Sequence, residues 1–405
     1  MSAIRPFRAV RPAREAAPAV SSVPYDVVTT EEARQLASSN PLSFLHVTRS
    51  EIDLPPGADP YSADVYAKAR ANFTALRAQA PLVEEEQPAL YLYRLRMGGH
   101  EQTGVAACFS VDEYEADLIK KHERTRPDKE DDRTRHIIEL RAQTGVVFLT
   151  YKSDESIDRL CRAVMSDAPI YDFRADDGVQ HTIWRVGARE STPLVDAFRQ
   201  IPALYIADGH HRAASAARTR AELRSRGDEG DSGWFIAVAF PDDQMNILPY
   251  NRVVKDLAGK TPVQFLQALR AVLPVKDGSA TPRGKGDVSM YLDGRWYSLD
   301  FTGAAPEDTS RAASLDVALL QHHVLAPLLS IGDVRTDKRI DFVGGARGTA
   351  ALEKAVNEGR AAVAFSMHPV TIEDLMSISD EGGIMPPKST WFEPKLRDGL
   401  LVHTV

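Results

Sequence analysis

The chain is poor in cysteine and has no long hydrophobic run. Its 405 residues include two cysteines, Cys108 and Cys161, which form neither a C-x-x-C pair nor a metal-binding spacing. Cys108 lies in a strand-like run, where a free cysteine acts as a small buried hydrophobe. No apolar stretch approaches the length of a membrane span, and the N-terminal residues lack the hydrophobic region of a signal peptide. We therefore expect a cytoplasmic protein with reduced thiols and no membrane contact.

The chain also lacks an excess of positive charge. Its 49 basic and 57 acidic residues give a formal net charge of −8. Because duplex binding depends on a net positive surface, this balance argues against a dedicated nucleic-acid binder, although it allows a local basic pocket.

Internal repeats and low-complexity runs are absent, and the length predicts two domains or one elaborate domain with a second lobe.

The most informative segment is Asp208-Gly209-His210-His211-Arg212, which lies between an apolar run and an alanine-rich stretch. The pattern predicts a strand, a tight turn and a helix, whose N-terminal N–H groups and dipole favour an anion. Arg212 offers a bidentate phosphate donor, and Asp208 is suited to cap the helix or hold a metal ion. The alternative is a capped helix with two surface histidines.

A second cluster of mixed charge covers residues 120–136. If the segment is extended, Lys121 and Glu123 share a face, so that Lys121 holds an anion while Glu123 takes a proton. Pro127 suits the first turn of a following helix, in which Lys129 and Arg133 form one basic stripe. The alternative is a salt-bridged surface helix.

The remaining chain predicts hairpins across residues 98–99 and 177–178, and a change of character near residue 255. We expect domains at 1–255 and 256–405. Near the end, Lys388, Ser389 and Thr390 follow two prolines and are candidates to clamp a phosphate, with a packed structural turn as the alternative. Arg8 is a further pocket candidate, although an arginine on an edge strand is more often solvated.

The whole chain resembles an uncharacterised bacterial and archaeal family, the domain-of-unknown-function family DUF 1015. The segments that carry this resemblance are Ile4–Ala9, Pro24–Val27, Ser43–Val47, Lys120–Arg133, Asp208–Arg212 and Met385–Thr390.

The strand followed by Asp-Gly-His-His-Arg also resembles the nucleotide-phosphate motif of the ParB/sulfiredoxin-like fold. Free-serine kinases of that superfamily have an Asp-Gly-x-His-Arg motif and phosphorylate the hydroxyl of serine with ADP or ATP. This resemblance implies an α+β (mixed α/β) fold, with a ParB/sulfiredoxin-like mixed-sheet core carrying insertions and a smaller α+β C-terminal lobe. His210 stands where sulfiredoxins have their cysteine, so sulfinic-acid reduction is not expected, and no helix-turn-helix segment follows as in a ParB clamp.

These observations lead to a hypothesis of phosphoryl transfer from ATP or ADP to a small hydroxyl-bearing metabolite, with free L-serine as the first candidate. Glu123 is the expected general base, with His122 or His210 as second choice. Lys121 and Asp208 complete the catalytic set. Phosphate binding is assigned to Gly209, His210, His211, Arg212, Arg126, Lys129 and Arg133. Mg²⁺ is expected with the nucleotide, without a protein-only metal site.

The sequence favours a small-molecule kinase, but two other functions stay open. One is a small phosphate-ester phosphatase, which needs no nucleotide. The other is a non-catalytic nucleotide sensor, which binds without turnover. We expect a small-molecule substrate, and a homodimer is the assembly that we consider. The sequence leaves open whether the segments around residues 121–136 and 208–212 meet in space.

Overall fold

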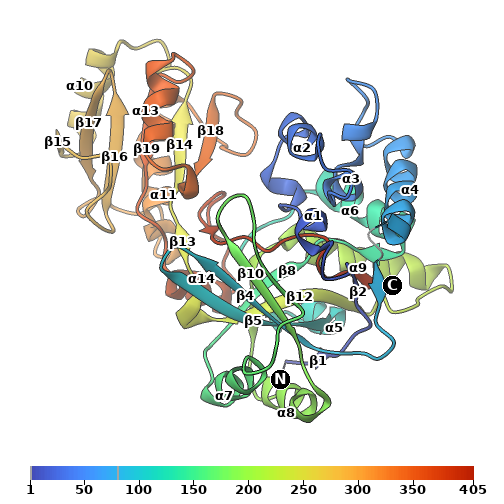
Figure 1. The fold of residues 1–405 in the computed structure, drawn as a ribbon. Helices are drawn as coiled ribbons and strands as arrows, with labels where there is room; N and C mark the ends of the chain where they lie inside the picture. The colour runs from blue at the N-terminus through green and yellow to red at the C-terminus, as the bar shows by residue number, and fades with distance from the viewer. Residues whose placement is uncertain (1, 80–81) are drawn as a thin grey trace. The chain divides into compact units, whose positions relative to one another are not determined.

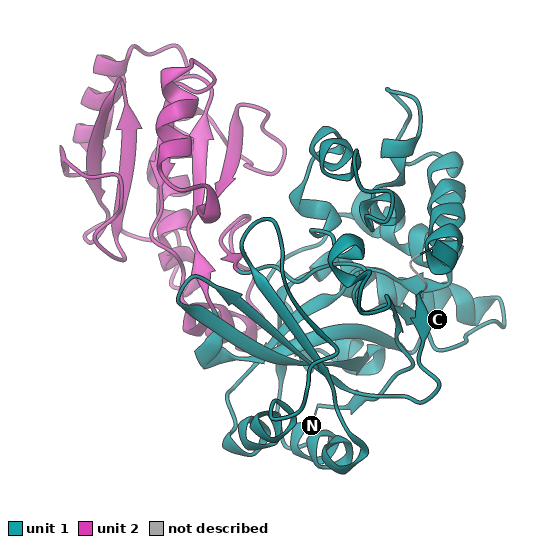
Figure 2. Cartoon of the chain, viewed as in Figure 1, with its two compact units in different colours: residues 1–245, 394–405 teal, residues 246–393 magenta. Residues whose placement is uncertain are grey.

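The computed structural model describes residues 2–79 and 82–405. The chain forms two compact units, of which the first comprises residues 1–245 with 394–405 and the second comprises residues 246–393 (Figure 2). The chain thus leaves the first unit once and returns to it for its last residues. The expected division into domains at residue 255 stays a prediction, whereas the predicted mixed α/β class is confirmed.

Nine of the described strands form one mixed sheet in the first unit, in the order β6-β11-β8-β12-β5-β4-β10-β9, with β1 paired to β5. Only the β6–β11 and β8–β12 pairs of this sheet are parallel among these strands. The predicted hairpins are β4–β5 and β9–β10, which turn at left-handed Gly98 and Gly178. The strands are β1 Ile4–Arg5, β4 Tyr91–Met97, β5 His100–Ser110, β6 Ile119–Lys120, β8 Val147–Tyr151, β9 Tyr171–Arg174, β10 Gln180–Arg185, β11 Leu204–Asp208 and β12 Trp234–Pro241. Two short ladders join β2 Val10–Arg11 to β3 Val83–Glu84 and β7 Ala142–Gln143 to β21 His403–Thr404.

Helices lie on both sides of this sheet. Figure 1 shows α7 and α8 on one side and α1 to α4 on the other. One apolar core joins the sheet to α7, α8 and α9, and a second packs α1, α3, α4 and α6 together. The helices are α1 Ala17–Val20, α2 Thr30–Ala37, α3 Leu45–Thr48, α4 Ala63–Gln79, α5 Val111–Glu115, α6 Pro127–Leu140, α7 Glu155–Val164, α8 Ala188–Phe198 and α9 His210–Ser225, with 3₁₀ turns η1 Tyr25–Val27, η2 Ser50–Asp53 and η3 Asp242–Gln244.

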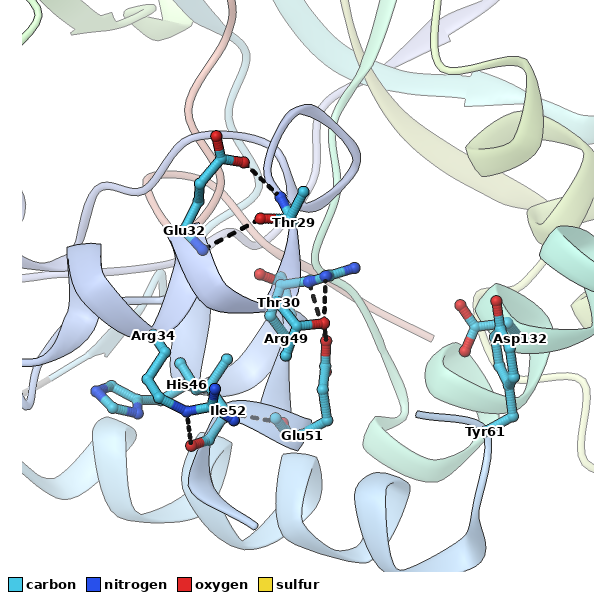
Figure 3. A network of polar contacts seen from close by, with 12 residues as sticks. Thr29, Thr30, Glu32, Arg34, His46, Arg49, Glu51, Ile52, Tyr61 and Asp132 are labelled. Atoms are coloured by element: carbon cyan, nitrogen blue, oxygen red, sulfur yellow. Dashed lines mark hydrogen bonds and ion pairs between the residues drawn. The ribbon is translucent and has the colours of Figure 1, made fainter. Parts of the chain in front are cut away.

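A polar network fixes the segment that follows η1 (Figure 3). Thr29 and Glu32 form a reciprocal capping box at the start of α2, with bonds of 3.2 and 2.8 Å. Arg49 lies 3.0 Å from the Glu51 carboxylate and donates to the Thr30 hydroxyl at 2.9 Å. These bonds tie α2 to η2 and so hold the turn that precedes α2 in place.

The second unit is built on a six-stranded sheet of described strands in the order β15-β17-β16-β19-β14-β18, with antiparallel pairing throughout. Helix α13 packs Leu352 and Ala355 against Val253, Tyr291 and Ala364 of this sheet. The elements are β13 Ile247–Leu248, β14 Tyr250–Val254, α10 Pro262–Val272, β15 Val275–Asp277, β16 Asp287–Leu292, β17 Arg295–Asp300, η4 Ala312–Ser314, α11 Asp316–Leu320, a π-helical turn Gln321–Leu325, α12 Ala326–Leu329, β18 Ile340–Gly344, η6 Gly345–Arg347, α13 Ala350–Asn357, β19 Val363–Ser366, α14 Ile372–Asp380 and β20 Trp391–Phe392. Within residues 2–79 and 82–405, none of the helices combines the length and the apolar character needed to cross a membrane.

Candidate functional site

The Asp-Gly-His-His-Arg segment forms the strand, turn and helix that the sequence predicts. β11 leads into Gly209, whose backbone is left-handed (φ +95°), and α9 begins at His210. A Cβ at position 209 would lie 3.4 Å from Val147 Cα, so the φ angle and the close approach of β8 both favour glycine. The first intrahelical bond of α9 runs from the Ala213 N–H to the Gly209 carbonyl. The N–H groups of residues 210–212 therefore lie outside the helical ladder and face the turn.

The sheet brings the mixed-charge cluster to the same turn. β6 pairs with β11 in parallel, with Lys120 opposite Tyr205. Because parallel strands end at the same edge of a sheet, the residues after Lys120 emerge beside the residues after β11. The two clusters, which the sequence alone leaves unconnected, therefore meet at one edge of the first unit.

Direct contacts join the clusters. The backbone N–H of His122 donates to His210 Nε2 at 3.4 Å, and the two imidazole rings lie 4.4 Å apart at an interplanar angle of 87°. The backbone N–H of Arg126 donates to His211 Nε2 at 3.0 Å. The segment between β6 and α6 is thus held against the first turn of α9 by the two neighbouring histidines.

Burial keeps the paired histidines neutral. His122 and His210 are 2% and 5% exposed, so the two rings are not surface histidines. Burial lowers the pKa of His122 to about 4, although Asp208 and the Ile206 backbone favour its charged form. Burial, with the neighbouring His122, also lowers the pKa of His210 well below its usual value. Both rings are therefore uncharged at neutral pH, and the Glu123 carboxylate lies 3.8 Å from His210 Nδ1.

Arg212 is engaged by groups of the protein itself. It is 7% exposed, and its guanidinium donates to the Val146 carbonyl at 2.7 Å and to both oxygens of Asp26 at 2.9 and 3.0 Å. A Cβ on Gly145 would lie 3.1 Å from the Arg212 side chain, which indicates how closely the backbone packs against it. Burial opposes its charge, but Asp26 and Asp208 raise the pKa of Arg212 above its usual value. The fork that the sequence assigns to a phosphate thus binds a carboxylate.

A second carboxylate is buried beside this pair. Asp398 is 2% exposed, and its Oδ2 has no hydrogen-bond partner in the described part of the chain. Burial raises the pKa of Asp398 to about 7, while Arg212 opposes this rise and Asp26 adds to it. The carboxyl group of Asp398 therefore exchanges a proton close to neutral pH.

The last residues of the chain also supply a cation to the turn. Lys395 Nζ donates to Asp208 Oδ2 at 2.8 Å, and the two side chains are 14% and 25% exposed. Burial alone would raise the pKa of Asp208, but Lys395 and Arg212 hold it well below its usual range. Asp208 is therefore a carboxylate at neutral pH, with Lys395 as its direct partner.

The other predicted cations lie around the turn but contact groups of the protein. These contacts are Lys121 with Asp117 at 3.1 Å and over the Tyr114 ring, Arg126 with Asp128 at 2.8 Å, Lys129 with the Tyr61 hydroxyl, and Arg133 with Asp132 at 2.8 Å and over the Tyr25 ring. Helix α6 begins at Pro127 as predicted. Lys129 and Arg133 do not form the expected basic stripe. The Arg133 side chain contacts buried partners, whereas Lys129 stays near the surface.

The remaining candidates contact other parts of the chain. In the second unit, Lys388 has a left-handed backbone (φ +58°) and its Nζ lies 5.5 Å from the Tyr250 ring centre. The Ser389 hydroxyl donates to the Pro386 carbonyl at 2.6 Å, and Thr390 is half-buried beside it. In the first unit, Arg8 is half-exposed and lies 3.5 Å from Glu84, as a solvated edge arginine does.

A metal site made by the protein alone is not found in the described residues, where no three His, Cys, Asp or Glu side chains are grouped to hold an ion. The turn contains the carboxylate of Asp208, but its nearest partner is the ammonium group of Lys395. The donor set at this turn therefore fits an anion better than a bare cation.

The sequence profile described as "Protein of unknown function (DUF1015)" matches residues 4–318. The chain belongs to this family. No curated protein matches the chain. Among solved structures, SbnI with a C-terminal truncation, from Staphylococcus aureus, has a TM-score of 0.40 and 13% identity over 74% of this chain and 87% of that one.

Two further solved structures match this DUF1015 chain with comparable TM-scores. A conserved hypothetical protein from Pyrococcus furiosus has a TM-score of 0.37 and 14% identity over 74% of this chain and 95% of that one. A free serine kinase in complex with AMP has a TM-score of 0.37 and 12% identity over 74% and 91%. At these TM-scores the similarity is too weak to transfer any residue role to this member of the family.

Three residues of this DUF1015 chain lie at the turn without having been singled out from the sequence. They are Asp26, Lys395 and Asp398. Asp26 lies in the Pro-Tyr-Asp-Val segment that carries the family resemblance, and this segment was the only signal for it. Lys395 and Asp398 gave no signal, since their role follows from the return of the chain to the first unit.

Proposed function

We propose that the first unit binds a nucleotide at the turn between β11 and α9 and transfers a phosphoryl group to a small hydroxyl-bearing metabolite. Free L-serine is the first acceptor to test, because the motif resembles that of free-serine kinases. The observation that carries the proposal is the contact between His122 and His210, since it brings a general-base candidate to a helix N-terminus suited to phosphate.

Each group at the turn has a part in this reaction. The N–H groups at the start of α9 bind phosphate oxygens. Glu123, 39% exposed and next to the buried imidazoles, accepts the proton of the attacking hydroxyl. The new bond joins the acceptor oxygen to phosphorus, and the bond from phosphorus to the nucleotide oxygen breaks. His210 accepts the backbone N–H of His122 and so positions this segment, and burial keeps both rings neutral.

Magnesium enters this proposal only with the nucleotide. The described residues offer no set of three ligands for a protein-held ion, and the carboxylate of Asp208 is already paired with Lys395. Phosphate-bound Mg²⁺ neutralises charge on the transferring group when it is present, and the parts assigned to the side chains do not depend on it.

The test is a ³¹P NMR assay of the full chain with Mg²⁺, ATP or ADP, and L-serine. We expect a phosphoserine resonance that Glu123→Gln reduces by about 10²- to 10⁴-fold in rate, the range of a lost general base, while nucleotide binding is retained. Glu115→Gln is the matched control, because Glu115 is a half-exposed glutamate that lies 3.9 Å from Arg220, away from the turn.

Other outcomes separate the competing functions. Phosphate release from a small ester without any nucleotide would indicate a phosphatase. Nucleotide binding without product from any hydroxyl acceptor would indicate a sensor. Equal rates for the Glu123→Gln variant and the unchanged chain would refute the base assignment and leave the phosphate site to be tested alone.

A further inference from the structure

The second unit contains a buried arginine whose charge is not compensated by a carboxylate. Three arginines are buried in the described part of the chain, namely Arg212, Arg252 and Arg397. Arg212 pairs with Asp26, and Arg397 pairs with Asp177. Arg252 lies on β14 and is 3% exposed, and no aspartate or glutamate among residues 2–79 and 82–405 forms an ion pair with it. A buried charge is costly unless an opposite charge compensates it, so Arg252 requires an explanation that the other two do not.

Neutral groups hold the guanidinium of Arg252. Its Nη1 donates to the Tyr250 carbonyl, and its Nη2 donates to the carbonyls of Pro387 and Lys388 at 3.4 and 2.9 Å. Its central carbon lies 5.5 Å from the centre of the Phe342 ring. Burial lowers the pKa of Arg252 to about 10, with Tyr250 opposing the shift. The group therefore still carries its positive charge at neutral pH, and these contacts orient that charge without neutralising it.

The loop that contacts Arg252 is held in a defined conformation. The Ser389 hydroxyl donates to the Pro386 carbonyl at 2.6 Å, and Ser389 is buried. Lys388 has a left-handed backbone (φ +58°), which is uncommon for a residue other than glycine. Unusual backbone conformations of this kind cluster at ligand-binding sites. The loop at residues 386–389 thus presents two successive carbonyls to one guanidinium.

Three partly exposed aromatic rings form a row next to this guanidinium. The Phe342 ring, below Arg252, lies 5.9 Å from the Tyr250 ring, which lies 5.1 Å from the Trp391 ring. A Cβ on Gly344 would lie 2.6 Å from the Trp391 ring, so the indole packs directly against β18. Aromatic rings keep water away from the charge, and the attraction between opposite charges is stronger where water is excluded.

We propose that the second unit has an anion site of its own, in which Arg252 binds a small oxyanion, the phosphate or carboxylate group of a ligand, beside the loop at residues 386–389. A guanidinium has five N–H donors, and three hydrogen bonds join this one to the protein. The remaining donors and the uncompensated charge suit an oxyanion, which is the partner that the planar guanidinium binds best. The site lies within the second unit and does not depend on the proposed nucleotide site.

Binding is measured by ¹⁹F NMR on the full chain labelled with 5-fluorotryptophan and titrated with sodium phosphate or sodium acetate at constant ionic strength. Trp391 reports on the site, and Trp391→Phe assigns its resonance. Trp296 is the internal reference, because it packs with Val253 on the opposite face of the sheet from Arg252. We expect the anion to shift the Trp391 resonance in a saturable manner and to leave the Trp296 resonance in place.

Three variants connect this response to Arg252. Arg252→Met is expected to weaken anion binding about tenfold to a hundredfold, as the loss of a hydrogen bond to a charged group does. Arg252→Lys keeps the charge without the planar fork and is expected to restore part of the loss. Arg311→Met is the matched control, because Arg311 belongs to the same unit but pairs with Asp374 at 2.9 Å, and it should bind the anion as the unchanged chain does.

Each result decides for or against the inference. A saturable shift of the Trp391 resonance that Arg252→Met removes supports it, and the anion that causes the shift identifies the phosphate or the carboxylate class. No shift with either anion overturns it, as do equal shifts of the Trp391 and Trp296 resonances, which indicate a general salt effect. Unchanged affinity in Arg252→Met also overturns it. If that variant does not fold, Arg252→Lys decides, since reduced affinity supports the inference and unchanged affinity overturns it.

Discussion

The stability of the protein is predicted to depend on pH through the buried carboxyl group of Asp398. Its folded-state pKa of about 7 lies above the ordinary value of 3.8, because burial and the neighbouring Asp26 raise it more than Arg212, the Tyr25 backbone and Arg133 lower it. The folded protein therefore binds a proton that the unfolded chain releases between pH 4 and 7. The stabilisation from this proton is complete below pH 4 and is lost as the pH rises through 7.

The size of the effect follows from the same values. A difference of about 3 pKa units corresponds to about 4 kcal/mol, at about 1.4 kcal/mol per unit. Asp398→Asn removes the titrating group. We therefore expect the stability of this variant, relative to the unchanged chain, to rise by up to about 4 kcal/mol between pH 4 and pH 8. The sign is opposite to that of a salt-bridged carboxylate, which stabilises more as pH rises.

Guanidinium unfolding followed by circular dichroism at pH 4, 5, 6, 7 and 8 measures this difference. Asp242→Asn is the control, since Asp242 is a buried aspartate whose pKa is lowered by bonds from Lys152 and the Ser153 backbone, against the effect of burial. Its charge is constant from pH 5 to 8, so this variant should follow the unchanged chain in parallel. Parallel curves for Asp398→Asn would refute the reasoning, because they would mean that Asp398 is already ionised at pH 5.

Three shorter predictions concern the same turn. Arg212→Met should lower the free energy of unfolding by about 1.5–3 kcal/mol, because it removes charged hydrogen bonds to Asp26 and the Val146 carbonyl. Exposed Arg126→Met should change it by less than about 0.5 kcal/mol, and chemical denaturation compares the two. Gly209→Ala should cost about 1–2 kcal/mol from the left-handed backbone alone, measured the same way. The His122 ring should stay neutral at pH 5.5 in an NMR titration, since its pKa is about 4, and a midpoint near 6.5 would contradict its burial.

Local patterns in the sequence predict the local structure well. The strand, turn and helix at residues 204–225, the helix that begins at Pro127, and the hairpins at Gly98 and Gly178 all follow from signals a few residues long. Glycine with a positive φ and proline in the first helical turn act through the backbone of their own neighbourhood. The meeting of the two clusters does not follow from such local signals, because it depends on the parallel pairing of β6 with β11.

The roles of charged side chains are harder to predict, because they depend on partners far away in the chain. Arg212 and Asp26 are 186 residues apart, and Lys395 and Asp208 are 187 apart. An arginine beside a helix N-terminus has the same sequence pattern whether it binds a phosphate or a carboxylate of the protein itself. The cost of burying the guanidinium determines its partner. A buried guanidinium requires a compensating charge, and the protein itself must supply that charge when no ligand is bound.

The contact of Lys395 with Asp208 means that the candidate site includes residues from the C-terminal segment, which follows the second unit in the chain. The second unit is inserted between Met245 and Pro394, and the chain re-enters the first unit directly before Lys395. A protein cut after residue 393 would keep the Asp-Gly-His-His-Arg turn and the mixed-charge cluster, but it would lose the partner of Asp208 and the carboxyl group of Asp398. The charge balance of the turn therefore requires both ends of the first unit, and a fragment that ends at residue 245 should not reproduce its binding.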